Sequence, residues 1–342
     1  MTETRLTVTV SEYGSFVGLK SERVQVRKGK ETVEEAPLFQ VERVLVMGRG
    51  ISVSTDLIME CAERGIPLHV LTSLGKPAAM LMSGSLTGTV KTRREQLLAF
   101  ADTRGVKLAK AFARGKCQNQ ANLLKYMAKY RKTRAPELYR EARDAAIAIE
   151  GLADEIGHLQ ADTVDDLRSS LLNREGRAAQ TYWEAIGKLM LSEVVWVGRE
   201  HRGTDDIVNK AINYGYGILY TRVEQALVLA GLDPYGGFVH VDRPGKPSLV
   251  LDAIEEFRQP IVDRTLFGLL NKGMELKVDE EGWLTAETRR VLADKMNARM
   301  DGAEPYEGKK RTLRAILASQ AAHIATFVRG ERTVYEPFVA RW

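Results

Sequence analysis

The sequence of 342 residues contains little cysteine and no long apolar run. Its two cysteines, Cys61 and Cys117, are far apart and show no CxxC spacing, which argues against a disulfide framework and a zinc knuckle. No stretch approaches the roughly 18 apolar residues that a membrane helix requires. The first ten residues also lack the basic and apolar regions of an export signal. We therefore expect a cytoplasmic protein that does not enter a membrane.

An excess of one charge sign is also nearly absent. The chain has 50 Lys and Arg residues against 45 Asp and Glu residues, which gives a formal net charge of +5 and a pI near 9.0. This balance is compatible with a polyanionic partner such as DNA but does not require one. Composition alone therefore identifies no partner.

The N-terminal quarter of the chain has the pattern of a β-domain. Between residues 6 and 82, short segments alternate apolar and polar side chains with period two, as strands do. Residues 55–63 are the exception and predict one short helix that ends before Gly65. The strands are too short and too closely spaced for repeated helical crossovers, so we predict a small β-sandwich over residues 1–85.

The rest of the chain has the pattern of a helical domain. The composition changes within residues 83–88, and helix-forming residues dominate beyond that point. We predict an all-α domain over residues 86–342 that ends in an irregular tail, and hence an α+β protein. Its expected helices cover residues 91–116, 118–132, 136–156, 163–190, 205–230, 248–258, 264–270, 285–300 and 308–328.

One face of the helix expected over residues 163–190 carries a carboxylate with little beside it. Glu175, Ala178, Ala179 and Tyr182 follow the spacing i, i+3, i+4 and i+7, so they share that face. The two alanines leave a shallow recess where a metal ion and a phosphate could approach Glu175. The same pattern also fits a solvated helix acid, so this stretch alone does not decide its role.

A second group of candidate ligands follows a Gly/Pro-rich turn. His240 precedes a loop, and the helix expected after that loop carries Asp252, Glu255 and Glu256 at i, i+3 and i+4. One imidazole together with two carboxylates suits Mn²⁺ or Mg²⁺, which retain positions for water or substrate phosphate. Together with Glu175, these residues predict a metal site.

Four segments of the helical half together resemble the CRISPR-associated endonuclease and integrase family, the first-numbered of the CRISPR-associated proteins. The segments are NREGRAAQTYW, NYGYGILY, GLDPYGGFVH and KPSLVLDAIEEFRQPIVDR. The N-terminal segment VERVLVMGRGISVSTDLIMECAERGIPLHVLTSLGKP is similar to the β-domain of the same family. The resemblance implies an N-terminal β-sandwich, a C-terminal helical domain and a homodimer.

The resemblance also assigns ligands to a metal site. The Glu of the EGxAAxxYW-like motif corresponds to Glu175, the His that closes the GFVH segment to His240, and the acid of the DxxE step to Glu255. Some members carry Asp at the third position, so Glu255 stays within the family pattern. Asp252 lies close by in sequence as a supporting residue or an alternative ligand, and Glu256 receives no role.

The activity that the resemblance implies is insertion of short foreign DNA, the spacer, into the CRISPR repeat array in antiviral defence. A 3′-hydroxyl of the incoming DNA would attack a phosphodiester at the repeat boundary, with Mg²⁺ or Mn²⁺ as cofactor, and water in its place would give endonuclease activity. The DNA would be held mainly through its phosphates, for which Arg243, Lys246 and Arg258 are the nearest candidates. The implied protein partner is the second CRISPR-associated protein, as a small dimeric scaffold.

Two other functions remain open from the sequence. A metal-dependent nuclease that acts in DNA repair, outside CRISPR, would use the same site residues. A non-catalytic DNA-binding scaffold would carry Glu175 and Glu255 as solvated acids and would bind DNA regardless of a chelator. Only strand transfer into a repeat separates the integrase from the repair nuclease, whereas the scaffold would give no product at all.

Overall fold

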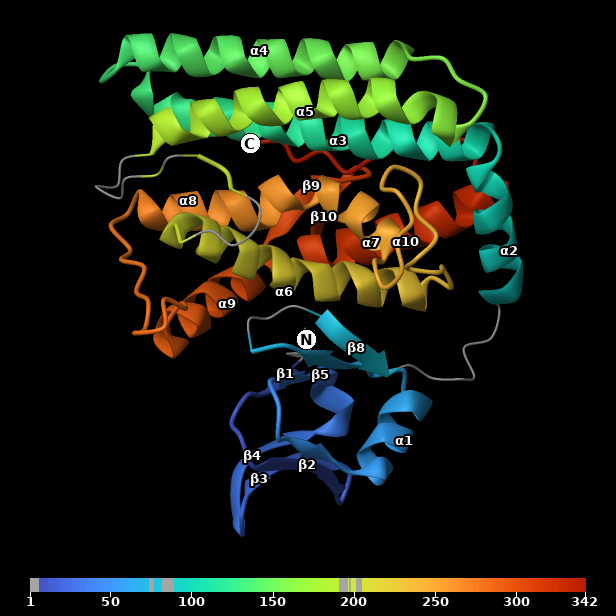
Figure 1. The fold of residues 1–342 in the computed structure, drawn as a ribbon, viewed down its shortest axis with the longest axis vertical. Coiled ribbons are helices and arrows are strands. Elements are labelled where there is room, and N and C mark those ends of the chain that lie inside the picture. The colour runs from blue at the N-terminus through green and yellow to red at the C-terminus, as the bar shows by residue number, and fades with distance from the viewer. Residues whose placement is uncertain (1–5, 74–76, 82–88, 191–195, 197, 201–204) are drawn as a thin grey trace. The chain divides into compact units, whose positions relative to one another are not determined.

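The computed structural model forms two compact units, Met1–Thr87 and Gly88–Trp342, with strands in the first and mostly helices in the second (Figure 1). The predicted α+β class is confirmed. The residues that the structure describes are 6–73, 77–81, 89–190, 196, 198–200 and 205–342. None of the helices in this part of the chain is both long and apolar enough to cross a membrane.

The first unit contains two four-stranded sheets with the orders β1-β5-β7-β8 and β4-β3-β2-β6. In the first sheet β1, β5 and β7 are parallel and β8 is antiparallel to β7. The first sheet comprises β1 (Leu6–Val10), β5 (Val41–Met47), β7 (Leu68–Leu71) and β8 (Pro77–Leu81). The second comprises β4 (Glu31–Pro37), β3 (Arg23–Lys28), β2 (Ser15–Lys20) and β6 (Ser52–Val53).

Alternate side chains of these strands form one hydrophobic core. Val8 and Val44 from one sheet and Val17 and Val24 from the other are at most 1% exposed and belong to the same buried cluster. This arrangement follows from the period-two pattern, since successive side chains of a strand point to opposite faces. Helix α1 (Thr55–Glu63) begins at the N-cap Ser54 and adds Leu57 to this core.

The second unit packs its long helices in layers (Figure 1). Helices α3, α4 and α5 lie side by side, and α3 also contacts the segment 254–263 and α10. The helices are α2 (Thr89–Phe100), α3 (Thr103–Ala128), α4 (Pro136–His158), α5 (Val164–Leu189), α6 (Ile207–Leu229), α7 (Ser248–Ala253), α8 (Arg264–Leu270), α9 (Ala286–Met300) and α10 (Leu313–Val328). Shorter 3₁₀ turns η1, η2 and η3 cover Leu38–Gln40, Lys129–Arg131 and Ile254–Glu256, and η4 (Arg258–Asp263) is a π-helical turn.

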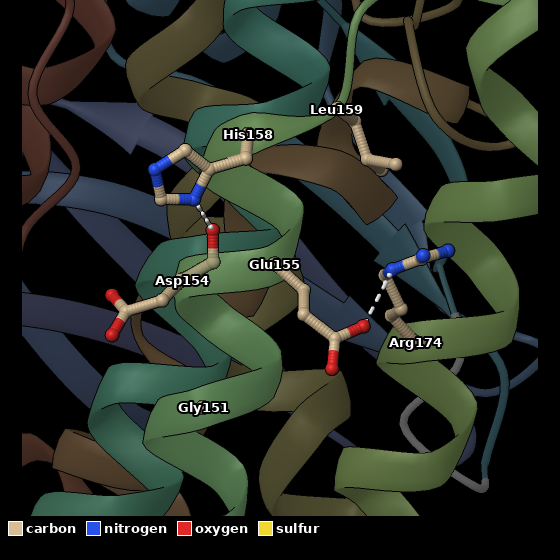
Figure 2. Close-up of a pocket in the computed structure, with 6 residues that line it drawn as sticks. All are labelled: Gly151, Asp154, Glu155, His158, Leu159 and Arg174. Carbon is tan, nitrogen blue, oxygen red and sulfur yellow. Dashed lines mark hydrogen bonds and ion pairs between the residues drawn. The ribbon is translucent and has the colours of Figure 1, made fainter.

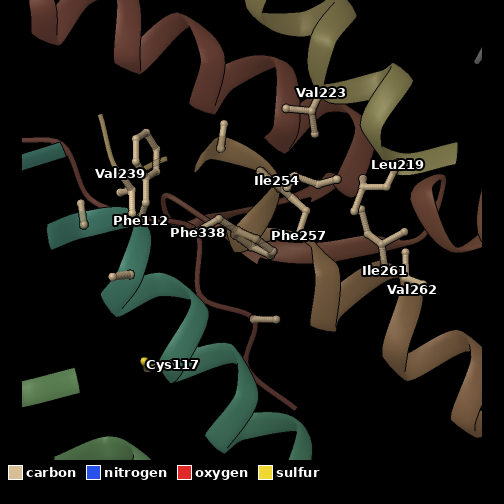
Figure 3. Close-up of a cluster of buried hydrophobic side chains, with 14 of the residues drawn as sticks. Phe112, Cys117, Leu219, Val223, Val239, Ile254, Phe257, Ile261, Val262 and Phe338 are labelled. Carbon is tan, nitrogen blue, oxygen red and sulfur yellow. The ribbon is translucent and has the colours of Figure 1, made fainter. Parts of the chain in front are cut away.

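The first helices of this unit divide at a different point from the predicted one. The sequence pattern predicts a break near residue 117, but α2 ends at Phe100 and α3 runs unbroken through Cys117. The side chain of Asp102 caps α3 by accepting the backbone N–H of Arg104 at 2.8 Å, and a cap of this kind marks a helix start. Cys117 is fully buried and belongs to the hydrophobic core of the second unit (Figure 3).

The helix predicted over residues 248–258 changes its winding twice. It begins as α7, tightens to the 3₁₀ turn η3 and widens to the π-helical turn η4. Pro260 has no N–H to donate to the carbonyl four residues earlier, and that carbonyl, of Glu256, instead accepts Asn119 Nδ2 at 2.9 Å. π-helical turns often occur at functional sites, and this one begins at Arg258, shortly after the predicted ligand Glu255.

The helical unit also contains a short hairpin where the sequence pattern predicts the start of a helix at residue 308. Strands β9 (Ala303–Tyr306) and β10 (Lys309–Thr312) are antiparallel. Their turn uses Glu307 and Gly308 with positive φ angles of 46° and 75°, which glycine adopts without strain. Helix α10 therefore starts only at Leu313, after Thr312 has capped it.

Candidate functional site

A cavity of about 970 Å³ opens between helices of the second unit, and all three predicted metal ligands line it. Glu175 reaches it from α5, His240 from the loop before α7, and Glu255 from η3. Ala179 also lines the cavity, whereas Ala178 and Tyr182 are fully buried in the core. The predicted recess beside Glu175 therefore exists, with only part of the predicted helix face around it.

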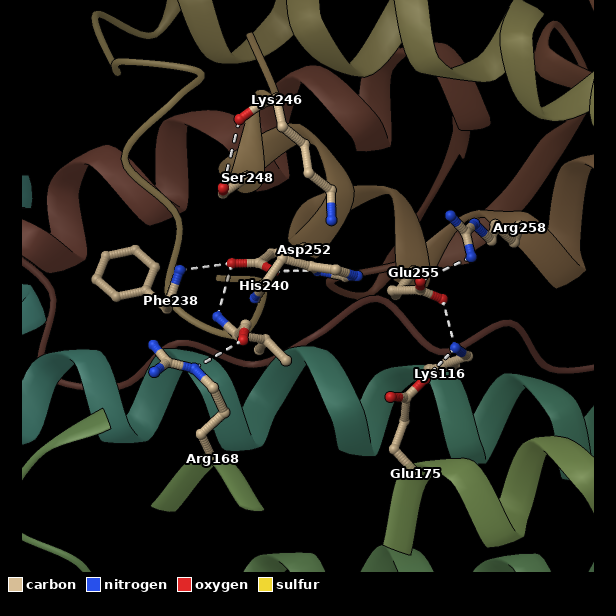
Figure 4. Close-up of polar contacts among 11 residues, drawn as sticks. Lys116, Arg168, Glu175, Phe238, His240, Lys246, Ser248, Asp252, Glu255 and Arg258 are labelled. Carbon is tan, nitrogen blue, oxygen red and sulfur yellow. Dashed lines mark hydrogen bonds and ion pairs between the residues drawn. The ribbon is translucent and has the colours of Figure 1, made fainter. Parts of the chain in front are cut away.

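The loop that carries His240 is held by one buried carboxylate (Figure 4). Asp252 is 0% exposed and accepts the backbone N–H groups of Phe238 at 2.6 Å, Val239 at 2.9 Å and His240 at 3.1 Å. It also contacts Nδ1 of His240 at 2.7 Å. Because an ionised carboxylate only accepts, Nδ1 is the donor. The other ring nitrogen, Nε2, is then the one that can bind a metal.

Gly237 permits this close approach of the loop to Asp252. A Cβ atom at position 237 would lie 2.5 Å from Cβ of Ser248 and 2.9 Å from Oδ2 of Asp252. The sequence pattern predicts an extended piece over residues 238–241, but the backbone bends there and forms no strand. The bend follows from the three N–H groups that converge on Asp252 in place of a strand partner.

Two cations neutralise Glu175 and Glu255, the two predicted glutamate ligands that line the cavity. The ammonium of Lys116, on α3, forms an ion pair with Oε1 of Glu175 and lies 3.0 Å from Oε2 of Glu255. Nη1 of Arg258 lies 2.7 Å from the other oxygen of Glu255. The side chains of Lys116, Glu175 and Glu255 are 10%, 21% and 8% exposed, so water screens these pairs only weakly.

The same contacts determine the pKa values of these groups. Burial opposes a charge on Lys116, but Glu255 and Glu175 together outweigh burial and raise the pKa of the ammonium. Burial also favours the neutral form of Glu255, but Arg258 and Lys116 outweigh it and lower the pKa of this carboxyl. Burial lowers the pKa of the Arg258 guanidinium, but the neighbouring Glu255 carboxylate outweighs burial and raises it. All three groups are therefore charged at neutral pH.

The donor set of the cavity fits a hard divalent cation. Two carboxylates and an imidazole anchored through its other nitrogen are ligands that Mg²⁺ and Mn²⁺ accept. Among the residues that the structure describes, no three His, Cys, Asp or Glu side chains stand close enough together to hold an ion without movement. In this arrangement Glu175 and Glu255 share the ammonium of Lys116.

A buried acid supports the cavity wall behind Arg258. Asp263 accepts hydrogen bonds from the hydroxyls of Tyr182 and Tyr216, each at 2.8 Å. The guanidinium of Arg258 lies 4.7 Å from the centre of the Tyr216 ring, a distance typical of a cation–π contact. Burial raises the pKa of Asp263 to about 6, against the opposing effect of the two tyrosine hydrogen bonds. This network fixes Arg258 and, through it, Glu255.

The three predicted phosphate-binding residues differ in their surroundings. Lys246 lines the cavity, and Arg243 is exposed in a turn whose two ends, Arg243 and Lys246, pair through their backbones. Arg258 also lines the cavity, but its guanidinium forms an ion pair with Glu255 and a cation–π contact with the Tyr216 ring. Of the three, only Lys246 both lines the cavity and has a side chain that forms no ion pair, hydrogen bond or cation–π contact in the described contacts.

Lys116 was not among the predicted site residues, and the sequence offers only a weak signal for it, a polar face on a helix that is otherwise mostly apolar. Lys116, Asn119 and Gln120 are polar at i, i+3 and i+4 of a helix whose other face is apolar, and all three are at most 8% exposed. Buried polar residues at helical spacing mark a face that meets other polar groups. Here Asn119 binds the carbonyl oxygens of Glu256 and Phe338.

Glu256 does not line the cavity but binds buried groups of the C-terminal segment. Its carboxylate accepts the hydroxyl of Tyr335, and one oxygen accepts Nε2 of Gln320 and the backbone N–H of Phe338, both at 2.8 Å. The ring of Phe338 also stacks on Phe257, with ring centres 5.5 Å apart. The predicted irregular tail is thus a packed segment attached to the residue next to Glu255.

A Glu256→Gln substitution tests this buried carboxyl. Burial raises its pKa from 4.5 to about 7 despite its hydrogen bonds. The folded state then retains a proton that the unfolded state loses, so this contribution to stability is full below pH 4.5 and is lost as pH rises through 7. Between pH 5 and 8 we expect wild type to lose about 2 kcal/mol of unfolding free energy relative to the variant.

The measurement is urea unfolding followed by tryptophan fluorescence at both pH values. All four tryptophans lie in the second unit, so the signal reports this unit. Stability curves of the two proteins that run parallel across this pH range would contradict the buried titration of Glu256.

A second, shallower hollow of about 410 Å³ lies between α4 and α5 (Figure 2). Three of its polar side chains, those of Glu155, His158 and Arg174, have partners within the chain. Glu155 pairs with Arg174 at 3.0 Å, and Nδ1 of His158 donates to the carbonyl oxygen of Asp154 at 2.8 Å. We assign no function to this hollow.

Comparison with known proteins gives the family. The family model described as CRISPR associated protein Cas1 matches residues 8–298. A protein of Archaeoglobus fulgidus named CRISPR-associated endonuclease Cas1 1 is 34% identical over 346 aligned positions, which cover 98% of this chain and 99% of that protein.

Two solved structures share the fold. A casposase bound to integration product has a TM-score of 0.79 at 20% identity, covering 96% of this chain and 92% of that one. A chain of a Cas6-RT-Cas1–Cas2 complex has a TM-score of 0.77 at 19% identity, covering 98% of this chain and 36% of that one. The resemblance found in the sequence motifs is therefore confirmed, and this chain belongs to the Cas1 family of CRISPR-associated proteins.

Proposed function

We propose that this protein is a metal-dependent DNA endonuclease and integrase of CRISPR adaptation, which inserts short foreign DNA into the repeat array. The observation that carries the proposal is the convergence of Glu175, His240 and Glu255 on one cavity. The endonuclease name of its relatives and its fold likeness to a casposase bound to integration product support the same chemistry.

Glu175, His240 and Glu255 would hold Mg²⁺ or Mn²⁺ in this cavity. A bound ion supplies Lewis-acid stabilisation of the charge that develops on the phosphate. Asp252 orients His240 and keeps its proton on Nδ1, and Arg258 fixes one oxygen of Glu255. The protein therefore presents ligands of defined direction before DNA arrives.

The reaction joins strands without an external energy source. The 3′-hydroxyl oxygen of the incoming DNA forms a bond to phosphorus, and the bond from phosphorus to the 3′-oxygen of the target strand breaks. One phosphodiester replaces another, and the proton of the attacking hydroxyl ends on the released 3′-oxygen or in solvent. Water as the attacking group gives hydrolysis in the same site. Lys246, on the cavity wall, is placed to contact a DNA phosphate.

The proposed partners follow from the reaction and from the relatives. DNA with free 3′ ends and the CRISPR repeat are the substrates, held mainly through phosphates. We propose a homodimer that works with a Cas2 dimer as scaffold, a proposal supported by the fold likeness to a chain of a Cas1–Cas2 complex. We also propose a cytoplasmic location, where its two free, buried cysteines would stay reduced.

Strand transfer tests this function. The assay combines the protein, with and without its Cas2, with a short duplex that has free 3′-hydroxyls and a plasmid that carries the repeat. We expect joined product in Mn²⁺ or Mg²⁺ and none in EDTA, because without a metal ion the protein side chains provide no Lewis acid to stabilise charge on the phosphate.

The alternatives give different outcomes in the same assay. Metal-dependent cutting without joining, even with Cas2 present, would identify a nuclease that acts outside CRISPR. DNA binding that is indifferent to EDTA, with no product, would identify a non-catalytic scaffold. Either outcome would overturn the integrase proposal.

A further inference from the structure

Lys116 occupies the position between the two glutamates where a cation is needed. Its ammonium reaches across from α3 to Glu175 on α5 and to Glu255 on η3 (Figure 4). The three side chains belong to three separate elements, so no local sequence constraint brings them together. Two carboxylates as little exposed as these repel each other unless a positive charge lies near both.

The charges around this ammonium balance. Lys116 and Arg258 carry two positive charges, and Glu175 and Glu255 carry two negative charges. Arg258 is fixed, because it binds Oε1 of Glu255 at 2.7 Å and stacks on Tyr216. Lys116 instead ends in a compact ammonium on a flexible four-carbon chain, which can change direction without moving its helix. Of the two cations, Lys116 is the one that can be exchanged.

We propose that Lys116 is an internal counter-cation that holds Glu175 and Glu255 in place before a divalent metal binds, and that must leave both carboxylates when the metal binds. This inference rests on the proposed metal site and adds a property to it. Lys116 stabilises the metal-free protein and competes with the metal, so it lowers metal affinity. Loading of the site is an exchange of cations.

Direct metal binding tests the exchange. Mn²⁺ is titrated into wild type and Lys116→Met, and free Mn²⁺ is followed by its electron paramagnetic resonance signal. Methionine retains an unbranched side chain and removes the charge. We expect the variant to bind Mn²⁺ about tenfold more tightly or better, because a competing charge has left two weakly screened carboxylates. In EDTA we expect a lower melting temperature for the variant than for wild type, and a larger rise on adding Mn²⁺.

Lys125→Met is the matched control. Lys125 lies on the same helix and pairs with Glu150, so its replacement removes a lysine and an ion pair of α3 away from the cavity. We expect wild-type Mn²⁺ affinity for this control. If Lys116→Met does not fold in EDTA, Lys116→Gln, which keeps a hydrogen-bond donor without the charge, is titrated in its place.

The outcomes separate this inference from the function on which it rests. Wild type that binds Mn²⁺ as tightly as both Lys116 variants, or more tightly, would overturn the exchange and leave the metal site intact. Failure of wild type and both variants to bind Mn²⁺ at all would overturn the metal site and the exchange together. Tighter binding by the Lys116 variants with an unchanged Lys125 control is the expected result.

Discussion

Alanine in place of Glu175, His240 or Glu255 is expected to slow strand transfer about 1,000-fold or more. Each side chain lines the cavity, and each is one of the three groups that we propose hold the metal. Loss of one ligand removes several kcal/mol of charge stabilisation from the transition state, and about 4 kcal/mol corresponds to a factor of 1,000. The measurement is the single-turnover rate of joining with saturating Mn²⁺ and Cas2.

Glu184→Gln is the control for these variants. Glu184 is another acid of α5 that lines the same cavity, and it accepts a hydrogen bond from Gln180 at 3.0 Å. If only the proposed ligands matter, this variant joins strands at close to the wild-type rate. A ligand variant that folds, binds DNA and still joins strands like wild type would remove that residue from the site.

The alanine variant of Glu255 needs a separate check of stability. Its loss leaves the buried charges of Lys116 and Arg258 without their shared partner, and breaking a buried pair in this way costs about 3–5 kcal/mol. Glu175 is more exposed and has one described ion-pair partner, Lys116, so we expect a smaller effect on stability there. Circular dichroism and DNA binding of each variant distinguish lost ligation from lost structure.

The parts of the site that follow helical spacing could be predicted from the sequence. Glu175 faces the cavity because its position on α5 follows from the helical period, and the motifs placed His240 and Glu255 beside it. The strands of the first unit were predictable in the same way, since alternation of period two indicates a half-buried strand. Such patterns can be read from the sequence because they depend only on residues a few positions apart in the chain.

Other features depend on contacts between residues far apart in sequence. Lys116 meets Glu175 and Glu255 from positions 59 and 139 residues earlier in the chain, and no local pattern indicates that the three converge. The C-terminal tail forms no helix or strand, as predicted, but its packing could not be predicted because its partners, Glu256 and Asn119, are distant in sequence. The π-helical turn at Pro260 likewise depends on Asn119, which binds the carbonyl that the proline cannot.

Asparagine in place of Asp252 is expected to reduce strand transfer about 10- to 100-fold, although Asp252 does not line the cavity. The native carboxylate accepts four hydrogen bonds, three from backbone N–H groups and one from Nδ1 of His240. An asparagine has one acceptor oxygen, and its NH₂ group must face donors on the other side. We expect the unfolding free energy to fall by about 3 kcal/mol, and His240 to lose the contact that orients it.

Mn²⁺ affinity of the folded variant separates these two effects. A purely structural loss would lower the folded fraction and leave the affinity of folded molecules unchanged, whereas a misdirected His240 weakens Mn²⁺ binding by about 10- to 100-fold. Asp242→Asn is the control, because Asp242 is exposed in the same loop and should keep wild-type affinity. Equal Mn²⁺ affinity for Asp252→Asn and wild type would show that His240 needs no partner to act, and the carboxylate would then serve only to fold the loop.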